Sequence, residues 1–262
     1  MPVPGDSEAG GPRAGTQAVE RAIAILFCFS PDRPALGISE IARSVGLNVS
    51  TAHRLVKALV GAGLVEHDPT SERYRLGIGV AVLGHRALEQ TGFHLAKPIL
   101  AELAAATGES ASLGIRRGHE VVVIERAASV QPLRFDHPTG AEIPMHASAM
   151  GKVLLAFSGV PMTEAAASLE ELPRYTARTI DSHQALVTEL EAIRTRGVAI
   201  NREERYHGAS GIAAPVLSPG GIARAAVGVQ GPSLRLTAAR LKELAPLLRR
   251  AADEVSARVF WE

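Results

Sequence analysis

The sequence of 262 residues has little of what marks several large protein classes. Its single cysteine, Cys28, excludes an internal disulfide framework and a zinc site built only from cysteines. Aromatic residues make up 4% of the chain, so the core must consist mainly of leucine, valine, isoleucine and alanine. No stretch approaches the roughly 18 consecutive apolar residues that span a bilayer. We therefore expect no membrane association and a reducing, cytoplasmic setting.

The chain also lacks a surplus of charge. It has 28 Lys and Arg residues against 27 Asp and Glu residues, so the net charge of +1 gives no sign of a polyanionic partner. Residues 1–15 lack the apolar stretch of a signal peptide, and their Gly, Pro and Ala content predicts a disordered tail. Apolar residues nevertheless make up 46% of the chain, enough for the cores of a small domain and a larger one.

The residues after this tail show the helical spacing of apolar side chains. A first helix is expected at 17–30, with Thr16 as its N-cap. Ser39 is expected to cap a short second helix that ends at Gly46, because glycine readily adopts the left-handed backbone of a tight turn. A third helix is expected from about 48 to 60. A helix, a glycine turn and a second helix form the helix-turn-helix pattern of DNA-binding proteins.

The third helix points its apolar residues inward and leaves a polar face without any carboxylate, which suits the major groove of DNA. A β-hairpin with arms at 64–67 and 73–76 follows, which predicts a winged variant with basic residues on its second strand. The predicted DNA contacts are Ser39, Asn48, Ser50, Thr51, His53, Arg54, Lys57, Arg73 and Arg75. The alternative is a solvated helical face without a function. The small residue Ala42, the acid-free face and the basic hairpin together favour DNA binding.

The second half of the chain has a different pattern. Helices are expected at 80–91 and 95–107, and from Gly108 short β-rich runs alternate with helices. Together they predict an α+β or α/β domain with a central sheet covered by helices. The expected strands are 110–117, 120–128, 132–137, 141–147, 198–201, 210–218 and 223–231, and the expected helices are 148–157, 182–197 and 237–261, the last with Pro246 inside it.

We find no local signature of an enzyme in this half. The stretch "GASG" lacks the second glycine of a nucleophile elbow, since Ile212 stands there, and Asp136 and His137 would point to opposite faces of a strand. Glu203 and Glu204 are expected in a solvated turn. No catalytic residue, metal site or cofactor is predicted. A mostly apolar domain with a few polar groups fits the binding of a small molecule.

Several long stretches carry a resemblance to one family. They are "AVERAIAILFCFS", "SEIARSVGLNVSTAHRLVKALVGAGLVEHDPTSERYRLG", "PMHASAMGKVLLAF", "LPRYTARTI", "NREERYHGASGIAAPV" and "GPSLRLTAARLKELAPLLRRAADEVSARV". The sequence resembles the IclR family of bacterial transcriptional regulators from about residue 16 to 260. After the tail that the composition predicts (1–15), the resemblance implies a winged helix-turn-helix domain (16–77), a linker helix (78–92) and a GAF-like α/β effector-binding domain (93–262), an α+β fold as a whole.

The resemblance also implies homodimers or homotetramers on partly palindromic operators, and a small organic-acid effector. The backbone N–H groups of Ala149 and Met150 would lie at a helix start and suit a carboxylate. Gly211 and Gly228 would enlarge the pocket and favour a bulkier effector, aromatic or acylated. The effector-binding residues that the resemblance implies are Phe135, Ile143, Ala149, Met150, Asn201, Ala209, Gly211, Gly228 and Gln230. The alternative for each of them is simple packing in a core strand.

The sequence therefore predicts a DNA-binding transcriptional regulator that is not an enzyme. We expect the effector to alter the placement of two DNA-binding heads in a dimer through residues 78–92, with repression and activation both open. Two other functions remain as alternatives. One is a DNA-binding protein whose C-terminal domain only oligomerises, and the other is an enzyme with a helical dimerisation module.

Overall fold

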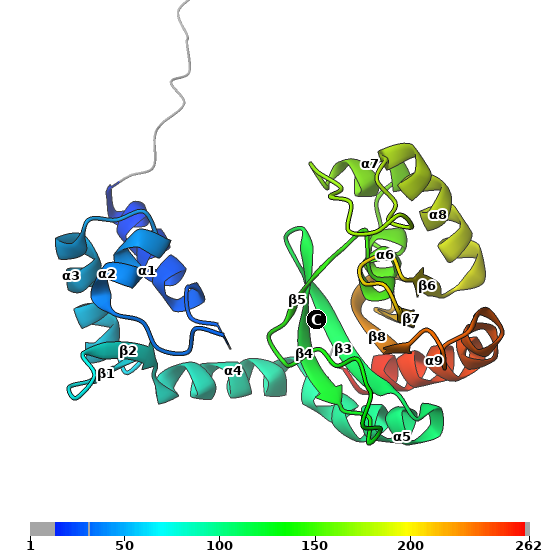
Figure 1. Ribbon diagram of the computed structural model, residues 1–262, viewed down its shortest axis with the longest axis horizontal. Helices are drawn as coiled ribbons and strands as arrows, with labels where there is room; N and C mark the ends of the chain where they lie inside the picture. The colour runs from blue at the N-terminus through cyan, green and yellow to red at the C-terminus, as the bar shows by residue number, and fades with distance from the viewer. Residues whose placement is uncertain (1–13, 31, 260–262) are drawn as a thin grey trace, which may run out of the picture. The chain divides into compact units, whose positions relative to one another are not determined.

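The computed structural model describes residues 14–30 and 32–259, which form two compact units (Figure 1). The first unit ends at Ala87 and the second begins at Leu88. Most of the predicted disordered tail lies outside the described residues. Its last two residues, Ala14 and Gly15, belong to the first helix.

The first unit contains three helices, a hairpin and most of a fourth helix. Its core is formed by apolar residues of the first three helices and of the first strand. Leu36, in the segment between the first two helices, pairs through its backbone with Tyr74 of the hairpin. β1 and β2 are antiparallel. The elements are α1 (Ala14–Phe27), α2 (Ile38–Ser44), α3 (Val49–Gly61), β1 (Val65–Asp68), β2 (Arg73–Leu76) and α4 (Ile78–Thr91).

Two predicted helix starts in this unit are wrong. α1 begins at Ala14, so Thr16 lies inside the helix and is not its N-cap; alanine is a strong helix former and extends the helix upstream. The N-cap of α2 is Gly37 and not Ser39. The carboxylate of Glu40 reaches back and accepts a hydrogen bond from the Gly37 N–H at 2.8 Å, which satisfies one unpaired donor of the helix start. This bond lowers the pKa of Glu40.

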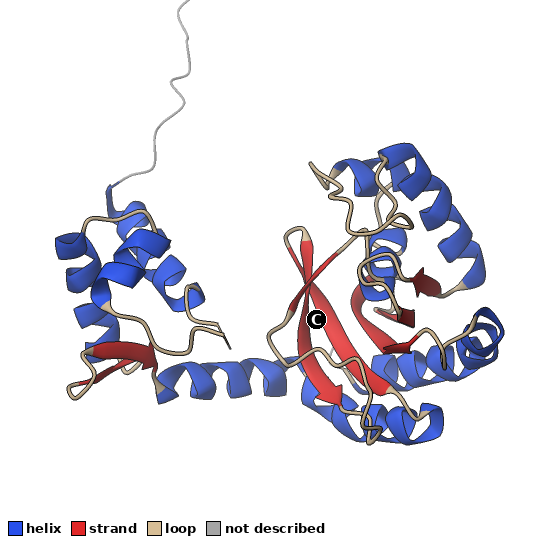
Figure 2. Ribbon diagram, viewed as in Figure 1, coloured by secondary structure: helices blue, strands red, loops and turns tan. Residues whose placement is uncertain are grey.

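The second unit is a six-stranded antiparallel sheet between two layers of helices, with strand order β5-β4-β3-β8-β7-β6 (Figure 2). The end of α4 is followed there by a short 3₁₀ helix at Phe93–Leu95. The other helices of this unit are α5 (Ala96–Thr107), α6 (Ala149–Ala156), α7 (Met162–Ala167), α8 (His183–Arg196) and α9 (Ala238–Arg258). Its strands are β3 (Ser110–Arg117), β4 (Glu120–Ala127), β5 (Glu142–Pro144), β6 (Ala199–Arg202), β7 (Ala209–Leu217) and β8 (Ala223–Pro232).

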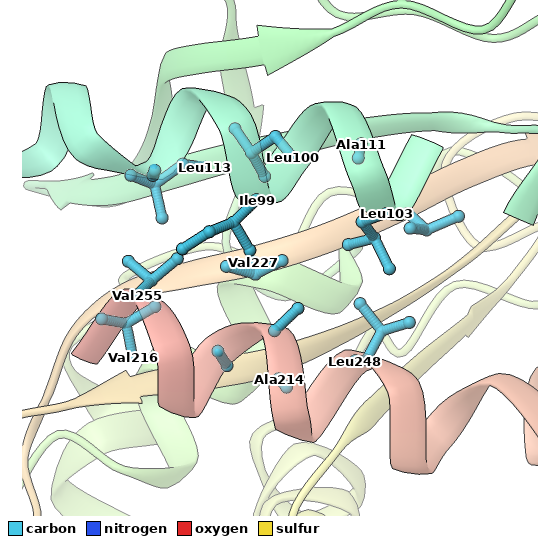
Figure 3. Packing of buried hydrophobic residues seen from close by; sticks show 14 of the residues in the cluster. Ile99, Leu100, Leu103, Ala111, Leu113, Ala214, Val216, Val227, Leu248 and Val255 are labelled. Atoms are coloured by element: carbon cyan, nitrogen blue, oxygen red, sulfur yellow. The ribbon is translucent and has the colours of Figure 1, made fainter. Parts of the chain in front are cut away.

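Each face of the sheet has its own apolar core. α5 and α9 pack on one face, where Leu100 and Leu248 meet Leu113 and Val227 of the strands (Figure 3). α6, α7 and α8 cover the other face. Burial of one such side chain contributes about 1.5–3 kcal/mol. Because alternate strand residues point to opposite faces, Ile212 and Ala213 of β7 belong to different cores.

The predicted α+β fold is confirmed, with one strand missing. Residues 132–137 were expected to form a strand, yet they belong to an irregular segment that we call the strap, residues 128–141. Pro132 and Pro138 stand at the two ends of the expected strand and cannot donate to a strand ladder. On the edge of β4 that faces away from β3, pairing begins where Gly140 N donates to Val123 O, and it continues with β5. None of the helices in the described ranges has both the length and the apolar character that crossing a membrane requires.

Candidate DNA-binding surface and effector pocket

The turn between α2 and α3 has the predicted form. Gly46 has a φ of +63°, a left-handed conformation that favours glycine, and Leu47 N donates to Ala42 O at 2.8 Å. Ala42 and Ala52 are both buried where the helices approach each other. Small side chains at these two positions therefore allow the close crossing of α2 and α3.

The start of α3 is organised by its N-cap. Asn48 accepts hydrogen bonds at Oδ1 from Thr51 N (2.8 Å) and from the Ser50 hydroxyl (3.0 Å). The exposed side chains that follow are Ser50, His53, Arg54 and Lys57, which we call the recognition face. Within the described residues neither Arg54 nor Lys57 forms an ion pair, so their charges are available to a partner. The sequence of α3 contains no acidic residue.

The remaining predicted DNA contacts lie on α2 and the hairpin. Ser39 is exposed on α2. Arg73 donates to Ala35 O and pairs with Glu40 at 2.8 Å, so it ties the hairpin to α2. Arg75 pairs with Glu66 at 2.9 Å across the hairpin. Exposed ion pairs of this kind contribute only about 0–1 kcal/mol, so DNA phosphates can replace the Arg75 partner at little cost.

A small hollow lies in the second unit. It is bounded by β3, β7 and β8, by the start of α6 and by the strap. None of the described residues that line it is acidic. The lining residues are Ser112, His137, Ile143, Ala147, Ser148, Ala149, Met150, Asn201, Arg205, Gly211, Ile212, Gly228, Val229 and Gln230.

Two of the expected effector contacts do not line this hollow. Phe135 lies in the irregular strap, where strand alternation does not apply, and His137 of the strap lines the hollow instead. Ala209 pairs with Pro232 at the start of β7, beyond the lining position Gly211. The sequence patterns also missed Arg205, because charged residues between β6 and β7 are typical of an ordinary solvated turn. The left-handed backbone of Glu203, with a φ of +61°, has no sequence signature.

The two glycines do not act as predicted. A Cβ atom on Gly228 would lie 2.8 Å from Met150 Cγ, so this glycine makes room for the Met150 side chain and not for a ligand. A Cβ atom on Gly211 would lie 2.9 Å from Val229 O. Both positions are close approaches inside the protein. The expected enlargement of the pocket by these glycines is therefore wrong.

A buried ion pair supports one wall of the hollow. Lys152 of α6 is 1% exposed, and its Nζ donates to Glu204 Oε1 at 2.6 Å and to Ile200 O at 2.8 Å. The backbone N–H of Glu204 donates to Asn201 Oδ1, whose amide nitrogen donates to Ala147 O at 2.6 Å. Asn201 thus joins β6 to the loop before α6. Glu204 was expected in a solvated turn, but it is buried because Lys152 provides a partner for its charge.

Burial also governs the titration of this unit. It raises the pKa of Glu204, against the opposing effect of the Lys152 charge. Burial lowers the pKa of His137, an effect that the Arg205 charge increases and a side-chain hydrogen bond with Gln230 opposes. Burial likewise lowers the pKa of His146, although its Nε2 lies 3.0 Å from Pro173 O. Burial therefore favours the neutral form of both histidines.

We expect the second unit to lose stability as the pH falls below about 6.5, the ordinary value for histidine. Below about pH 6.5 the two histidines take up protons in the unfolded chain, whereas His137 and His146 in the folded protein do so only at lower pH. Their contribution to the free energy of unfolding is therefore fully present above about pH 6.5 and is lost as the pH falls through their folded pKa values. Glu204 acts in the opposite sense, since its raised pKa favours the folded state below the pKa of the unfolded carboxyl. Urea unfolding between about pH 5.5 and 8 measures the sum.

The variant His146→Gln should flatten this pH dependence, because it removes one of the two histidines. His207→Gln removes an exposed histidine from the same unit and serves as the matched control, with the wild-type slope expected. Equal slopes for wild type and His146→Gln would show that the burial of this side chain does not govern acid sensitivity.

A helix-turn-helix with a basic, acid-free recognition face and a separate unit with an acid-free pocket define a DNA-binding protein with a sensor domain. The comparisons with known proteins identify the family. Residues 18–69 match the IclR helix-turn-helix domain, and residues 85–257 match the domain described as bacterial transcriptional regulator IclR C-terminal. The chain belongs to the IclR family of bacterial transcriptional regulators, so the resemblance seen in the sequence is confirmed. It is a DNA-binding regulator with an effector-binding C-terminal domain.

Named relatives extend over nearly the whole chain. The HTH-type transcriptional regulator BhcR of Paracoccus denitrificans is 34% identical over 243 residues, which cover 92% of this chain and 87% of that protein. The HTH-type transcriptional repressor AllR of Salmonella typhimurium is 32% identical over 263 residues, covering 97% and 93%. A crystal structure of an IclR homologue from Microbacterium hydrocarbonoxydans, complexed with 4-hydroxybenzoate, has a TM-score of 0.78 at 26% identity and covers 92% of this chain and 98% of that one.

Proposed function

We propose that the protein binds a partly palindromic operator as a homodimer or homotetramer and that a small organic acid bound in the hollow modulates its affinity. The start of α6 carries this proposal. Ser148 Oγ accepts a hydrogen bond from Gly151 N, whereas Ala149 and Met150 are the first two residues of the helix, whose N–H groups have no partner within a helix. These groups and the helix dipole favour a carboxylate in a hollow that lacks acidic side chains.

The chemistry of the remaining lining supports an acid with an apolar body. Ile143, Ala149 and Met150 offer apolar surface beside the polar groups of Ser112 and Gln230. The Microbacterium homologue binds 4-hydroxybenzoate, an acid of this type, in a related fold. We therefore retain an aromatic or acylated acid as the proposed effector class. Its support is now the chemistry of the lining residues and not the two glycines.

Exposed apolar side chains on the first unit support the dimer. On α1, Val19 and Ile23 lie one turn apart and are 59% and 48% exposed. On α4, Ile78 is 70% exposed, and no described residue of this helix is buried. Apolar surface of this kind favours association with a second copy, which would place two recognition helices for half-sites about 34 Å apart. We propose that the linker region, residues 78–92, transmits effector binding to the DNA-binding unit. We also propose that the protein acts in the cytoplasm, where the operator lies.

Titration of DNA with and without acids tests this function. A fragment enriched from a random DNA library on the full-length protein serves as the operator, and fluorescence anisotropy measures its Kd. Saturation with one of acetate, glyoxylate, benzoate, 4-hydroxybenzoate or hexanoate should change this Kd by about 5- to 150-fold, in either direction. An unchanged Kd with every acid would support a C-terminal domain that only oligomerises. Failure to enrich any fragment would overturn DNA regulation itself.

A further inference from the structure

Arg205 lines the effector hollow, and one of its guanidinium nitrogens is buried without a hydrogen-bond partner among the described residues. This residue follows β6 and is half-buried. A guanidinium cannot lose its charge in a protein, so an unpaired buried donor of this group costs free energy until an acceptor arrives. An unpaired cationic donor beside a ligand hollow points to an anionic ligand.

The other contacts of Arg205 hold the guanidinium in place without neutralising it. Nη2 donates to Glu142 O at 3.5 Å, and the guanidinium carbon lies 4.9 Å from the centre of the Tyr206 ring. A backbone carbonyl and an aromatic face restrict the group, yet neither carries a full negative charge. Arg205 is therefore preorganised for a charged acceptor.

The neighbouring carboxylates already have other partners. Glu204 pairs with Lys152, Glu142 pairs with Arg117, and Asp136 pairs with Arg126. Glu120 lies within the electrostatic influence of Arg205, but its closest interaction is with Glu142, which raises its pKa. None of the ion pairs found among the described residues includes Arg205.

The described lining residues beside Arg205 include no carboxylate. Burial lowers the pKa of His137 and the Arg205 charge lowers it further, against the opposing effects of Gln230 and Asp136. These effects together favour the neutral form of His137. Among the described residues of the lining, the N–H groups at the start of α6 contribute dipoles and Arg205 contributes the one permanent charge.

We propose that Arg205 binds the acid group of the effector through its guanidinium and is the residue by which the pocket selects acids over neutral molecules of the same shape. This inference rests on the proposed function, because it assigns a residue to the recognition of the proposed effector class. A charged donor that meets a carboxylate in a partly buried site forms a charge-assisted hydrogen bond, which is stronger than a bond between neutral groups. An amide of the same shape would leave the charge of Arg205 uncompensated.

Matched acid and amide pairs test the assignment. Isothermal titration of the full-length protein uses benzoate with benzamide, 4-hydroxybenzoate with 4-hydroxybenzamide, and hexanoate with hexanamide. At least one acid should bind the wild type, and its amide should bind at least about 10-fold more weakly. Arg205→Met, which removes the charge but keeps the length, should weaken the acid by about 10- to 100-fold and abolish the preference for it. Arg205→Lys should restore part of the acid binding.

Two controls separate recognition from folding. Arg202→Met removes an exposed arginine three residues away and should bind as the wild type does. The melting temperature of ligand-free Arg205→Met should equal or exceed that of the wild type, since the variant removes an unpaired buried donor. A lower melting temperature together with lost binding would indicate a structural role and overturn the inference.

The outcomes also distinguish this inference from the proposed function. Equal binding of one acid to wild type and Arg205→Met would overturn the role of Arg205 and leave the acid effector in place. Equal binding of acid and amide to the wild type would likewise overturn selection by charge. Absence of binding by all three acids would overturn the proposed effector class, and the inference with it.

Discussion

Replacement of Arg54 by alanine is expected to weaken operator binding by about 1–3 kcal/mol for each recognition helix, or roughly 5- to 150-fold. Arg54 is exposed on α3, forms no ion pair within the described residues, and lies beyond the N-cap at Asn48 that orients the helix start. Residues in the first turns of the second helix meet base edges in the major groove, where arginine binds guanine in a bidentate manner. A dimer loses this contact twice, so the full effect is larger than for one helix.

Anisotropy measurements on the fragment enriched with wild-type protein provide the test. Lys57→Ala should weaken binding more uniformly across DNA sequences and lower the salt slope by about one, as expected for a phosphate contact. Arg33→Ala removes an exposed arginine outside the recognition face and is the matched control. An Arg54→Ala protein that binds with unchanged affinity and specificity would show that α3 does not read DNA, and would favour a helical dimerisation module.

Replacement of Lys152 by alanine is expected to destabilise the second unit by about 3–5 kcal/mol, the cost of breaking a buried ion pair from one side. The variant leaves the Glu204 carboxylate buried without its 2.6 Å partner, and Glu204 Oε2 already lacks one. For a unit of this size the melting temperature should fall by about 6–20 °C. The loss also releases Asn201 and Ala147, so acid binding should weaken in the protein that remains folded.

A double-variant cycle distinguishes the ion pair from simple packing. Lys152→Met combined with Glu204→Leu removes both charges and should recover most of the stability, because an apolar pair can replace a buried ion pair at little cost. Lys97→Ala removes an exposed lysine from α5 and should leave the melting temperature within about 1–2 °C of the wild type. A double variant as unstable as Lys152→Ala would assign the loss to packing of the lysine stem.

The helix-turn-helix could be predicted from the sequence because its turn and helix cap depend on interactions between neighbouring residues. Gly46 sets the turn and Asn48 caps the next helix through bonds to residues two and three positions away, so the chain nearby contains all the information. Ser39 and Thr16 were assigned as caps on the same grounds and were wrong, because Glu40 and the helix former Ala14 compete with them over equally short distances. A strand that the sequence predicted correctly, β4, carries a run of β-branched residues.

The pocket depended on contacts between distant segments. Ala149, Met150, Asn201 and Gln230 were expected from the family resemblance, and they line the hollow, but their roles as effector contacts stay predictions. The patterns could not show that the prolines of the strap prevent a strand and bring His137 to the hollow in place of Phe135. Nor could they show that Met150 occupies the space above Gly228.

Short-range patterns in this chain thus specify where helices cap, turn and expose a basic face, since helix caps and turns are made by neighbours along the chain. Which charges become buried is decided across long separations. Lys152 and Glu204 lie 52 positions apart and neutralise each other, whereas Arg205, next to Glu204 in the chain, keeps an unpaired donor. The packing of α6 against β6 and β7 places Lys152 beside Glu204 and gives Arg205 no ion-pair partner among the described residues. A buried charge needs a partner, and the tertiary structure determines which residue lies close enough to provide it.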